Sequence, residues 1–269
     1  MKFLAFDTST DVMSIALTDG DRVWLHTGPG GAKSSTTLIP AILALMKRAQ
    51  AECGLTLGQL DAIAFGRGPG SFTGLRTACA VAQGLAFGAN QGAGIKVLPI
   101  DTLMAVAEEA RFQHAKAPLH ITALLDARMD EMYVQRFAFT EDQCLPLGEC
   151  TLIKPENLLP DAASGLLAGN VFGVYADRLS PSLLDLKRID ALPTASAMLR
   201  LAPMLAAAGH CVEASQALPL YIRDKVAFTT EERALAKEEK EQKEQKEQAA
   251  LSAERDLSSP SNPIFRKIE

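Results

Sequence analysis

Three observations predict an α/β protein built from two related halves. The chain has 269 residues, of which 48% are hydrophobic and 22% charged, enough for two cores of ordinary size. A short apolar run at 61–65 leads into a glycine-rich turn and then into a stretch with helical spacing at 72–88. A strand that ends in an aspartate, followed by a turn and a second strand, occurs once in each half, at Asp7 and at Asp126.

Composition and charge exclude several classes of protein. The formal net charge is -5, so the chain lacks the basic surface that a protein gripping tRNA by itself would need, and any nucleic acid would be held mostly by a partner. The cysteines number five, an odd count, without a CxxC pair, which fits a reducing compartment. No stretch approaches the roughly 20 apolar residues of a membrane span. We therefore expect a cytoplasmic protein without a membrane contact.

The first elements are three strands and a helix. The strands are predicted at 2–6, 12–17 and 22–27, with the dipeptide Asp19-Gly20 as the hairpin turn between the last two. A helix is expected to begin near Ser35, capped by the hydroxyl cluster at 34–36. Its apolar stripe has two interpretations, packing on the protein's own core or binding a partner helix. The stripe residues of interest are Leu38, Ile42 and Leu45.

The glycine turn follows the strand at 61–65. Its glycines and proline cannot continue a helix or a sheet ladder, and Ser71 is a good N-cap for the next helix. Such a turn either holds an anion at the helix N-terminus or is a close-packing turn. It is neither a Walker A loop nor a dinucleotide fingerprint, because the Lys-Ser/Thr pair and the glycine spacing are missing. The turn residues are Gly68, Pro69, Gly70, Ser71, Thr73 and Gly74.

The helix at 72–88 is rich in small residues, so its surface is nearly flat. Gly84 destabilises a helix interior by about 1 kcal/mol relative to Ala, which suggests a contact that needs the missing side chain. We expect a partner helix to approach closely over Ala78, Ala82 and Gly84. A strand is expected to follow at 95–98.

The two aspartate hairpins suggest an internal duplication. Asp7 is followed by Asp11 four residues later, and Asp126 is followed by Asp130 at the same interval. Each turn could present acidic and hydroxyl groups to a cleft where a nucleotide's phosphates and Mg²⁺ would lie, or its aspartates could be ordinary turn formers. The nucleotide-facing candidates are Asp7, Thr8, Ser9 and Asp126.

The rest of the second half is less regular. Irregular connections are expected over 140–160, a strand running into a glycine turn at 166–170, and a helix at 194–208 interrupted by Pro203. Beyond residue 228 the chain becomes a run of Glu, Lys, Gln and Ala without an apolar stripe. We expect this tail to be a helical or disordered surface appendage.

Four stretches together resemble the TsaB (YeaZ) family of bacterial tRNA-modification proteins. They are 6–11 (FDTSTD), 68–76 (GPGSFTGLR), 125–133 (LDARMDEMY) and 218–223 (LPLYIR), in matching order over roughly residues 1–228. The resemblance implies a duplicated actin/Hsp70-like (ASKHA) ATPase superfold. The domains would be 1–103, which carries the partner-binding helices, and 104–228, followed by the charged tail 229–269.

The resemblance also implies a function. TsaB is a non-catalytic subunit that binds the catalytic paralogue TsaD through helices of the N-terminal domain and works with the ATPase TsaE. The complex transfers the threonylcarbamoyl group from threonylcarbamoyl-AMP to N6 of adenosine 37 in tRNAs that read codons beginning with A. tRNA would be reached only through the complex, a homodimer is an alternative assembly, and ATP or ADP with Mg²⁺ would belong to the complex, since this subunit requires no cofactor.

The residues contain no arrangement for covalent or metal catalysis, so we expect neither catalytic nor metal-binding residues. The histidines, at 26, 114, 120 and 210, form no metal-ligand pair. The stretch 99–105 corresponds to the place where TsaD carries its metal-binding histidines, and it contains none. The hydroxyl cluster at 34–36 replaces the His-Ser-Glu of many relatives. The competing hypothesis is an autonomous ATPase or kinase of the same superfold that uses Asp7 and Asp126, although it lacks a complete phosphate cradle.

Overall fold

The computed structural model describes residues 1–92, 94–114, 119–140, 143–160, 165–183 and 186–223. Met1–Ile222 forms one compact unit. The tail predicted at 229–269 lies outside the described residues. None of the described helices is long and apolar enough to span a membrane.

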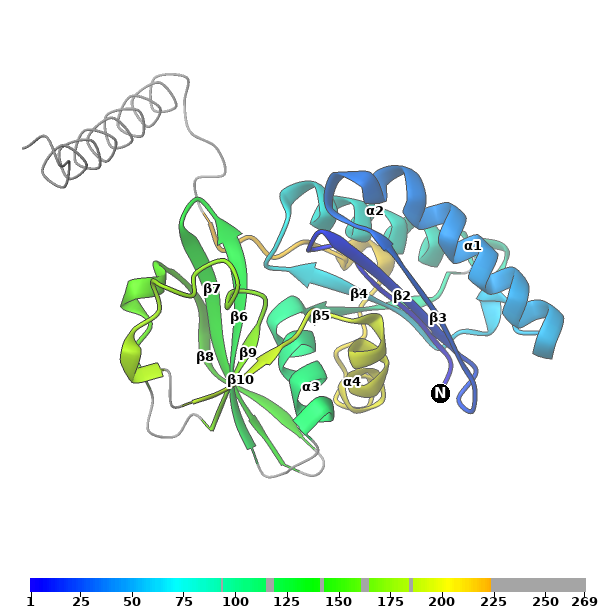
Figure 1. Cartoon of the computed structure of the whole chain (residues 1–269). Coiled ribbons are helices and arrows are strands. Elements are labelled where there is room, and N and C mark those ends of the chain that lie inside the picture. Colours follow the sequence, from blue (N-terminus) through cyan, green and yellow to red (C-terminus); the bar gives the residue numbers. More distant parts are fainter. Residues whose placement is uncertain (93, 115–118, 141–142, 161–164, 184–185, 224–269) are drawn as a thin grey trace, which may run out of the picture. The chain divides into compact units, whose positions relative to one another are not determined.

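The first sheet contains five strands in the order β3-β2-β1-β4-β5 (Figure 1). β1, β2 and β3 are antiparallel neighbours, whereas β4 pairs in parallel with β1 and with β5. Gly20, with φ +108°, supplies the turn between β2 and β3 that the Asp-Gly dipeptide predicts. The strands are β1 (Phe3–Asp7), β2 (Val12–Thr18), β3 (Val23–Pro29), β4 (Ala62–Gly68) and β5 (Lys96–Asp101).

The second sheet repeats this topology. Its order is β10-β9-β6-β7-β8, in which β6, β7 and β8 are antiparallel and β9 pairs in parallel with β6 and β10. β6 therefore corresponds to β1, and β9 to β4, so the internal duplication suggested by the two aspartate hairpins is confirmed at the level of topology. The strands are β6 (Leu119–Arg128), β7 (Glu131–Phe139), β8 (Cys144–Ile153), β9 (Leu166–Gly169) and β10 (Lys187–Asp190).

Four α-helices complete the described unit, namely α1 (Ser34–Cys53), α2 (Phe72–Gly88), α3 (Thr102–His114) and α4 (Ala195–Ala207). α1 and α2 cover one face of the first sheet (Figure 1) and share a core with Leu4, Phe6 and Ile15. α3, which ends the first half, packs mainly on β6 and β9 of the second sheet. α4, which ends the second half, packs on β1 and β2 of the first sheet. Each half is thus closed by the helix of the other.

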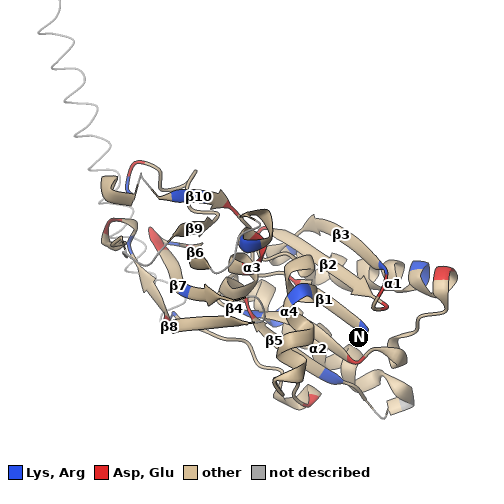
Figure 2. Ribbon diagram, turned by 90° about the horizontal axis from the view of Figure 1, so that it is seen from below, with Lys and Arg blue, Asp and Glu red and all other residues tan. Residues whose placement is uncertain are grey.

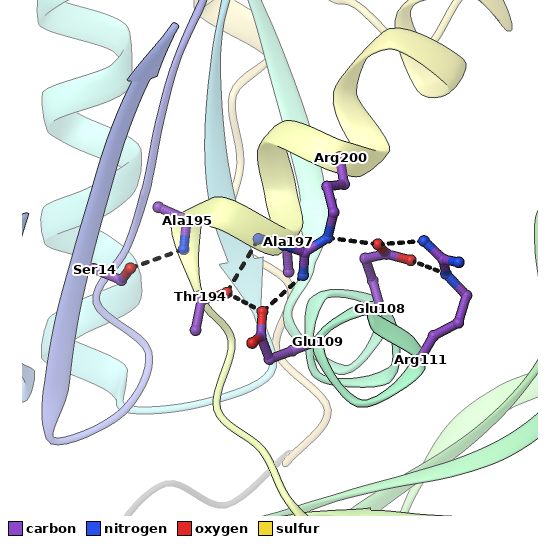
Figure 3. A network of polar contacts seen from close by, with 8 residues as sticks. All are labelled: Ser14, Glu108, Glu109, Arg111, Thr194, Ala195, Ala197 and Arg200. Atoms are coloured by element: carbon purple, nitrogen blue, oxygen red, sulfur yellow. Dashed lines mark hydrogen bonds and ion pairs between the residues drawn. The ribbon is translucent and has the colours of Figure 1, made fainter. Parts of the chain in front are cut away.

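A network of polar contacts joins α3 to α4 (Figure 3). The Glu108 side chain, only 3% exposed, accepts hydrogen bonds from Arg111 at 2.6 and 2.9 Å and from Arg200 at 2.7 Å. Its neighbour Glu109 accepts from Thr194 and Arg200, both at 2.7 Å. Burial by itself raises the pKa of the Glu109 carboxyl, but these hydrogen bonds outweigh it and hold the pKa below its usual value. The buried carboxylates are therefore paired charges.

The chain after residue 194 returns to the first half. The amide of Ala195 donates to Ser14 Oγ at 2.8 Å, Val212 forms an antiparallel bridge with Val97, and the amide of Leu220 donates to the Arg67 carbonyl at 2.7 Å. A boundary at residue 103 separates the two sheets in the sequence. Within the predicted second domain, 104–228, the helix α4 packs on β1 and β2 of the first sheet.

Several sequence expectations about elements are also corrected. The stretch expected to be irregular, 140–160, contains the strand β8. This strand lies at the edge of the sheet and is exposed along most of its length, so its sequence needs no alternation of apolar and polar residues. An edge strand also tolerates a proline such as Pro146. α4 runs as one helix past Pro203, which is exposed. The hydroxyls of Ser34, Ser35 and Thr36 do not cap α1. A 3-10 turn precedes that helix, and these hydroxyls donate back to its carbonyls.

Replacing Glu108 by alanine should lower the free energy of unfolding by about 3 kcal/mol, because Arg111 then loses its carboxylate partner and Arg200 keeps only Glu109. The matched control is Arg48→Ala, which removes an ion pair at 4.0 Å between side chains that are 62% and 47% exposed. That substitution should change stability by less than about 1 kcal/mol. Urea unfolding of both variants makes the comparison, and similar losses would contradict the role given to Glu108.

Candidate functional site

The glycine turn packs directly on the turn between β1 and β2. The amide of Ser71 donates to the Ser9 carbonyl at 2.7 Å, and the hydroxyl of Thr8 donates to the Gly74 carbonyl at 2.7 Å. Thr8 is fully buried and Ser9 is 4% exposed. The two turns therefore form one hydrogen-bonded unit at the end of the first sheet.

The glycines of this turn are required by close approach. A Cβ at Gly74 would lie 1.9 Å from the Thr8 carbonyl oxygen, and one at Gly70 would lie 2.6 Å from Ser9 Cβ. Gly68 has φ +123°, and a Cβ there would lie 2.5 Å from the Leu220 carbonyl oxygen. Of the two interpretations open from the sequence, an anion loop and a close-packing turn, these contacts favour the close-packing turn.

The remaining residues of the turn have ordinary structural roles. Ser71 is the N-cap of α2 and accepts from the Gly74 amide at 3.4 Å, as the sequence predicts. Pro69 is buried, whereas Thr73 is exposed and its carbonyl accepts from the Thr77 hydroxyl at 2.9 Å. None of these contacts points to a bound ligand.

Asp7 is a buried acid with one unsatisfied oxygen. Its Oδ1 accepts from the amide and the hydroxyl of Ser9 at 2.8 and 2.6 Å. Its Oδ2 is buried without a hydrogen-bond partner among the described residues, and a Cβ at Gly66 would lie 1.8 Å from it. Burial raises the pKa of this carboxyl to about 6, although the hydrogen bonds from Ser9 oppose the shift. Asp7 is therefore enclosed by its own chain.

The second aspartate, Asp126, is held by its surroundings in the second sheet. Its Oδ1 accepts from the Tyr175 hydroxyl and from the Arg128 amide, both at 2.8 Å, and its own amide donates to Asn170 Oδ1 at 2.9 Å. Arg178 binds Asp130 at 2.8 Å on the same hairpin and Glu156 at 2.7 Å. Sequence reasoning missed Tyr175 and Arg178. They lie about 45 or more residues from this turn in the sequence, and only the fold brings them close to it.

Arg128 connects the two hairpins. Its guanidinium forms ion pairs with Asp126 of its own hairpin at 3.3 Å and with Asp11 of the first hairpin at 2.5 Å. The interpretation that Asp7, Thr8, Ser9 and Asp126 face a nucleotide stays a prediction, since the first three are buried and Asp126 is bound by its neighbours, although Asp7 Oδ2 has no hydrogen-bond partner among the described residues.

The helix residues expected at a partner interface are mostly in the protein's own core. Five of the six are at most 3% exposed, and Gly84 alone is exposed. The stripe at i, i+4 and i+7 on α1 faces the first sheet, and the small residues of α2 allow that helix to lie close to β4. The interface assignment is wrong for Leu38, Ile42, Leu45, Ala78 and Ala82.

The solvent-facing sides of the same helices carry exposed apolar residues. On α1, Ile39 and Leu43 are 47% and 56% exposed, and on α2, Phe87 is 73% exposed. Ala80 and Gly84 lie between Arg76 and Phe87 at helical spacing and are exposed as well. We call Ile39, Leu43, Ala80, Gly84 and Phe87 the outer face. The sequence signal for it is an apolar residue one position beyond the core stripe, and such exposed apolar faces mark interaction sites.

Within the described residues, charged side chains are spread over several elements. Figure 2 shows segments of Lys and Arg interspersed with segments of Asp and Glu along the described ribbon. No group of three or more His, Cys, Asp or Glu side chains that could hold a metal ion occurs within the described ranges.

The fold and these turns define a class of protein. Two sheets of the same strand order, each closed by the helix of the other half, form a duplicated α/β structure of the actin/Hsp70-like (ASKHA) class. The chain belongs to the TsaB (YeaZ) family. A family model described as TsaD, tRNA N6-adenosine threonylcarbamoyltransferase, also matches residues 26–172.

The relatives align over most of their length. The chain is 34% identical over 238 residues to the tRNA threonylcarbamoyladenosine biosynthesis protein TsaB of Haemophilus influenzae. This alignment covers 85% of this chain and 96% of that protein. It is 31% identical over 235 residues to TsaB of Escherichia coli, covering 85% and 97%. The structure of YeaZ from Pseudomonas aeruginosa is 36% identical, with a TM-score of 0.70, over 82% of this chain and 99% of that one.

Replacing Gly70 by valine should unfold the protein or lower its melting temperature strongly, because the new side chain enters the space of Ser9. The matched control is Gly173→Val, since a Cβ at Gly173 meets nothing within 4 Å. Thermal unfolding followed by circular dichroism compares them. Equal stability of the two variants would show that the turn does not need its close approach.

Replacing Asp7 by asparagine should stabilise the protein at neutral pH. The folded-state pKa of about 6 lies above the ordinary value of 3.8, so the wild type loses stability as pH rises through this window and the carboxyl ionises while buried. The difference in unfolding free energy between variant and wild type should grow by about 3 kcal/mol from pH 4 to pH 7.5, at 1.36 kcal/mol for each pKa unit. Urea titrations across this range measure it, and a difference that does not change with pH would refute the assignment.

Proposed function

We propose that the protein is a non-catalytic subunit in the biosynthesis of threonylcarbamoyladenosine in tRNA, and that it binds a TsaD-type catalytic partner through the outer face of α1 and α2. One observation carries the proposal: a chain of the TsaB family exposes large apolar side chains on the two helices that cover its first sheet. The names of the relatives support the pathway, because the TsaB proteins of Haemophilus influenzae and Escherichia coli are called biosynthesis proteins of this modified nucleoside.

The size of the apolar contacts fits a protein partner. Fully burying a Leu, Ile or Phe side chain contributes roughly 1.5–3 kcal/mol, so Ile39, Leu43 and Phe87 together offset a large part of the entropic cost of association. Ala80 and Gly84 add little area but let a partner helix approach. The same face would serve a homodimer, and such a homodimer would compete with the heterodimer for it.

The arrangement of the polar residues supports a non-catalytic role in this proposal. Asp7, which an autonomous ATPase or kinase would use together with Asp126, is fully buried, and Asp126 accepts a hydrogen bond from Tyr175. The stretch 99–105 has no histidine, and Thr102–Ala105 begins the buried helix α3. In this proposal the catalytic partner supplies the metal, ATP or ADP with Mg²⁺ belongs to the complex with TsaE, and tRNA is held by the complex, in keeping with the net charge of -5 of this chain. The reaction served is threonylcarbamoyl transfer from threonylcarbamoyl-AMP to N6 of adenosine 37.

Replacing Phe87 by glutamate should abolish binding to TsaD while leaving the protein folded, because Phe87 is 73% exposed. The matched control is Val174→Glu, which places the same charge at a 58% exposed apolar residue of the second half and should leave binding unchanged. Size-exclusion chromatography with TsaD and circular dichroism of each variant provide the measurements.

A third variant separates the outer face from the core. Ala82→Glu puts a charge at a fully buried position and should unfold the protein. A folded Phe87→Glu variant that still forms the complex would place the interface elsewhere. A wild type that forms no complex with TsaD would overturn the proposed function.

A further inference from the structure

Arg76, in the second turn of α2, stacks on the ring of Phe72 and is hydrogen-bonded to Tyr221. Its guanidinium carbon lies 3.7 Å from the centroid of the Phe72 ring and 6.0 Å from that of Tyr221. Its Nε donates to the Tyr221 hydroxyl at 2.9 Å, and the two rings are 5.6 Å apart. Phe72 and Tyr221 are 37% and 44% exposed, so the cluster of these three side chains lies at the surface.

The ends of the guanidinium are not used by the chain. Among the described residues, no carboxylate forms an ion pair with Arg76, and Nε is the nitrogen for which a hydrogen bond is found. Arg111, Arg178 and Arg200, by contrast, each bind at least one carboxylate. Arg76 is therefore oriented by its neighbours while its two terminal nitrogens keep their donors available.

Such an arrangement is preorganised for an anion. Stacking on a ring and the hydrogen bond to Tyr221 restrict the rotamers of a long side chain, so less entropy is lost when it binds. The two terminal nitrogens of a guanidinium match the two oxygens of a carboxylate.

The position of the cluster indicates where the anion comes from. Phe72, Arg76, Ala80 and Gly84 follow one another at intervals of four residues, so Arg76 lies on the side of α2 that carries the outer face. A partner helix that runs along α2 and covers Phe87 at one point would also lie next to Arg76 at another point. The apolar neighbours and the net charge of -5 favour a protein over RNA as that partner.

We propose that Arg76 is the residue that sets the register and specificity of the partner complex, by receiving a side-chain carboxylate from the partner helix that covers the outer face. This inference rests on the proposed function. Tyr221 is a positioning residue in it, because its hydroxyl fixes the orientation of the guanidinium. The apolar outer face supplies contact area, whereas the single oriented charge selects one alignment of two helices.

The test uses the full chain and TsaD in isothermal titration at low and high salt. Arg76→Gln should weaken binding on the order of tenfold to a hundredfold at low salt and should reduce the salt dependence. Arg76→Lys keeps the charge but loses the two parallel N–H donors of the guanidinium, so its affinity should lie between those of the wild type and Arg76→Gln. Tyr221→Phe should have a smaller effect. The charge control is Arg48→Gln, which changes an exposed arginine on α1 instead of α2.

The outcomes separate this inference from the proposed function. If the wild type does not bind TsaD, the proposed function fails; if the wild type and Arg76→Gln bind equally well, only the Arg76 inference fails. A large fall in melting temperature of Arg76→Gln would overturn it in favour of a role in anchoring the segment around Tyr221. If Arg76→Gln loses binding of fluorescently labelled tRNA but keeps TsaD binding, the ligand is an RNA phosphate and the inference is overturned.

Discussion

Glu108 lies where α3 and α4 meet between the two sheets, and its buried carboxylate must stay paired with Arg111 and Arg200 for this contact to be stable. α3 belongs to the first half by sequence but packs on the second sheet, and α4 does the reverse. Each of these helices therefore helps to bury the sheet of the other half. A charge in this contact is stable only while both arginines are in place, so the polar network specifies how the exchanged helices align.

The glycine turn shows how a motif typical of phosphate binding can serve packing. Strand, glycine turn and helix N-terminus are all present. The space beside the glycines, however, is occupied by the Asp7–Ser9 segment at contact distance. Glycine is required here because a second backbone occupies the place of a side chain. The buried acid Asp7 remains in the same unit with one oxygen unsatisfied, which is consistent with a fold whose ligand-binding turns have been reused to hold the structure together.

In the proposed function, the binding surface is the outer face of α1 and α2 and not the turns that carry Asp7 and Asp126. The hairpin aspartates are engaged by Ser9, Tyr175 and Arg128, whereas Leu43 and Phe87 are left uncovered. The Arg76 cluster joins the outer face to the segment around Tyr221, which has crossed back from the second half. A surface made by two helices and by residues more than a hundred positions away is a product of the whole unit.

The sequence by itself determined the α/β class, the duplication and the family, because hydrophobic spacing, the Asp-Gly turn, the N-cap at Ser71 and the paired aspartate hairpins are local signals. It could not assign α3 and α4 to opposite sheets, since their apolar faces read the same whichever sheet they cover. It also could not decide which side of α1 faces solvent: Leu38 and Ile39 are adjacent and both apolar, and only the position of the first sheet buries one and exposes the other. Burial depends on what lies opposite a side chain, and that is decided by tertiary structure.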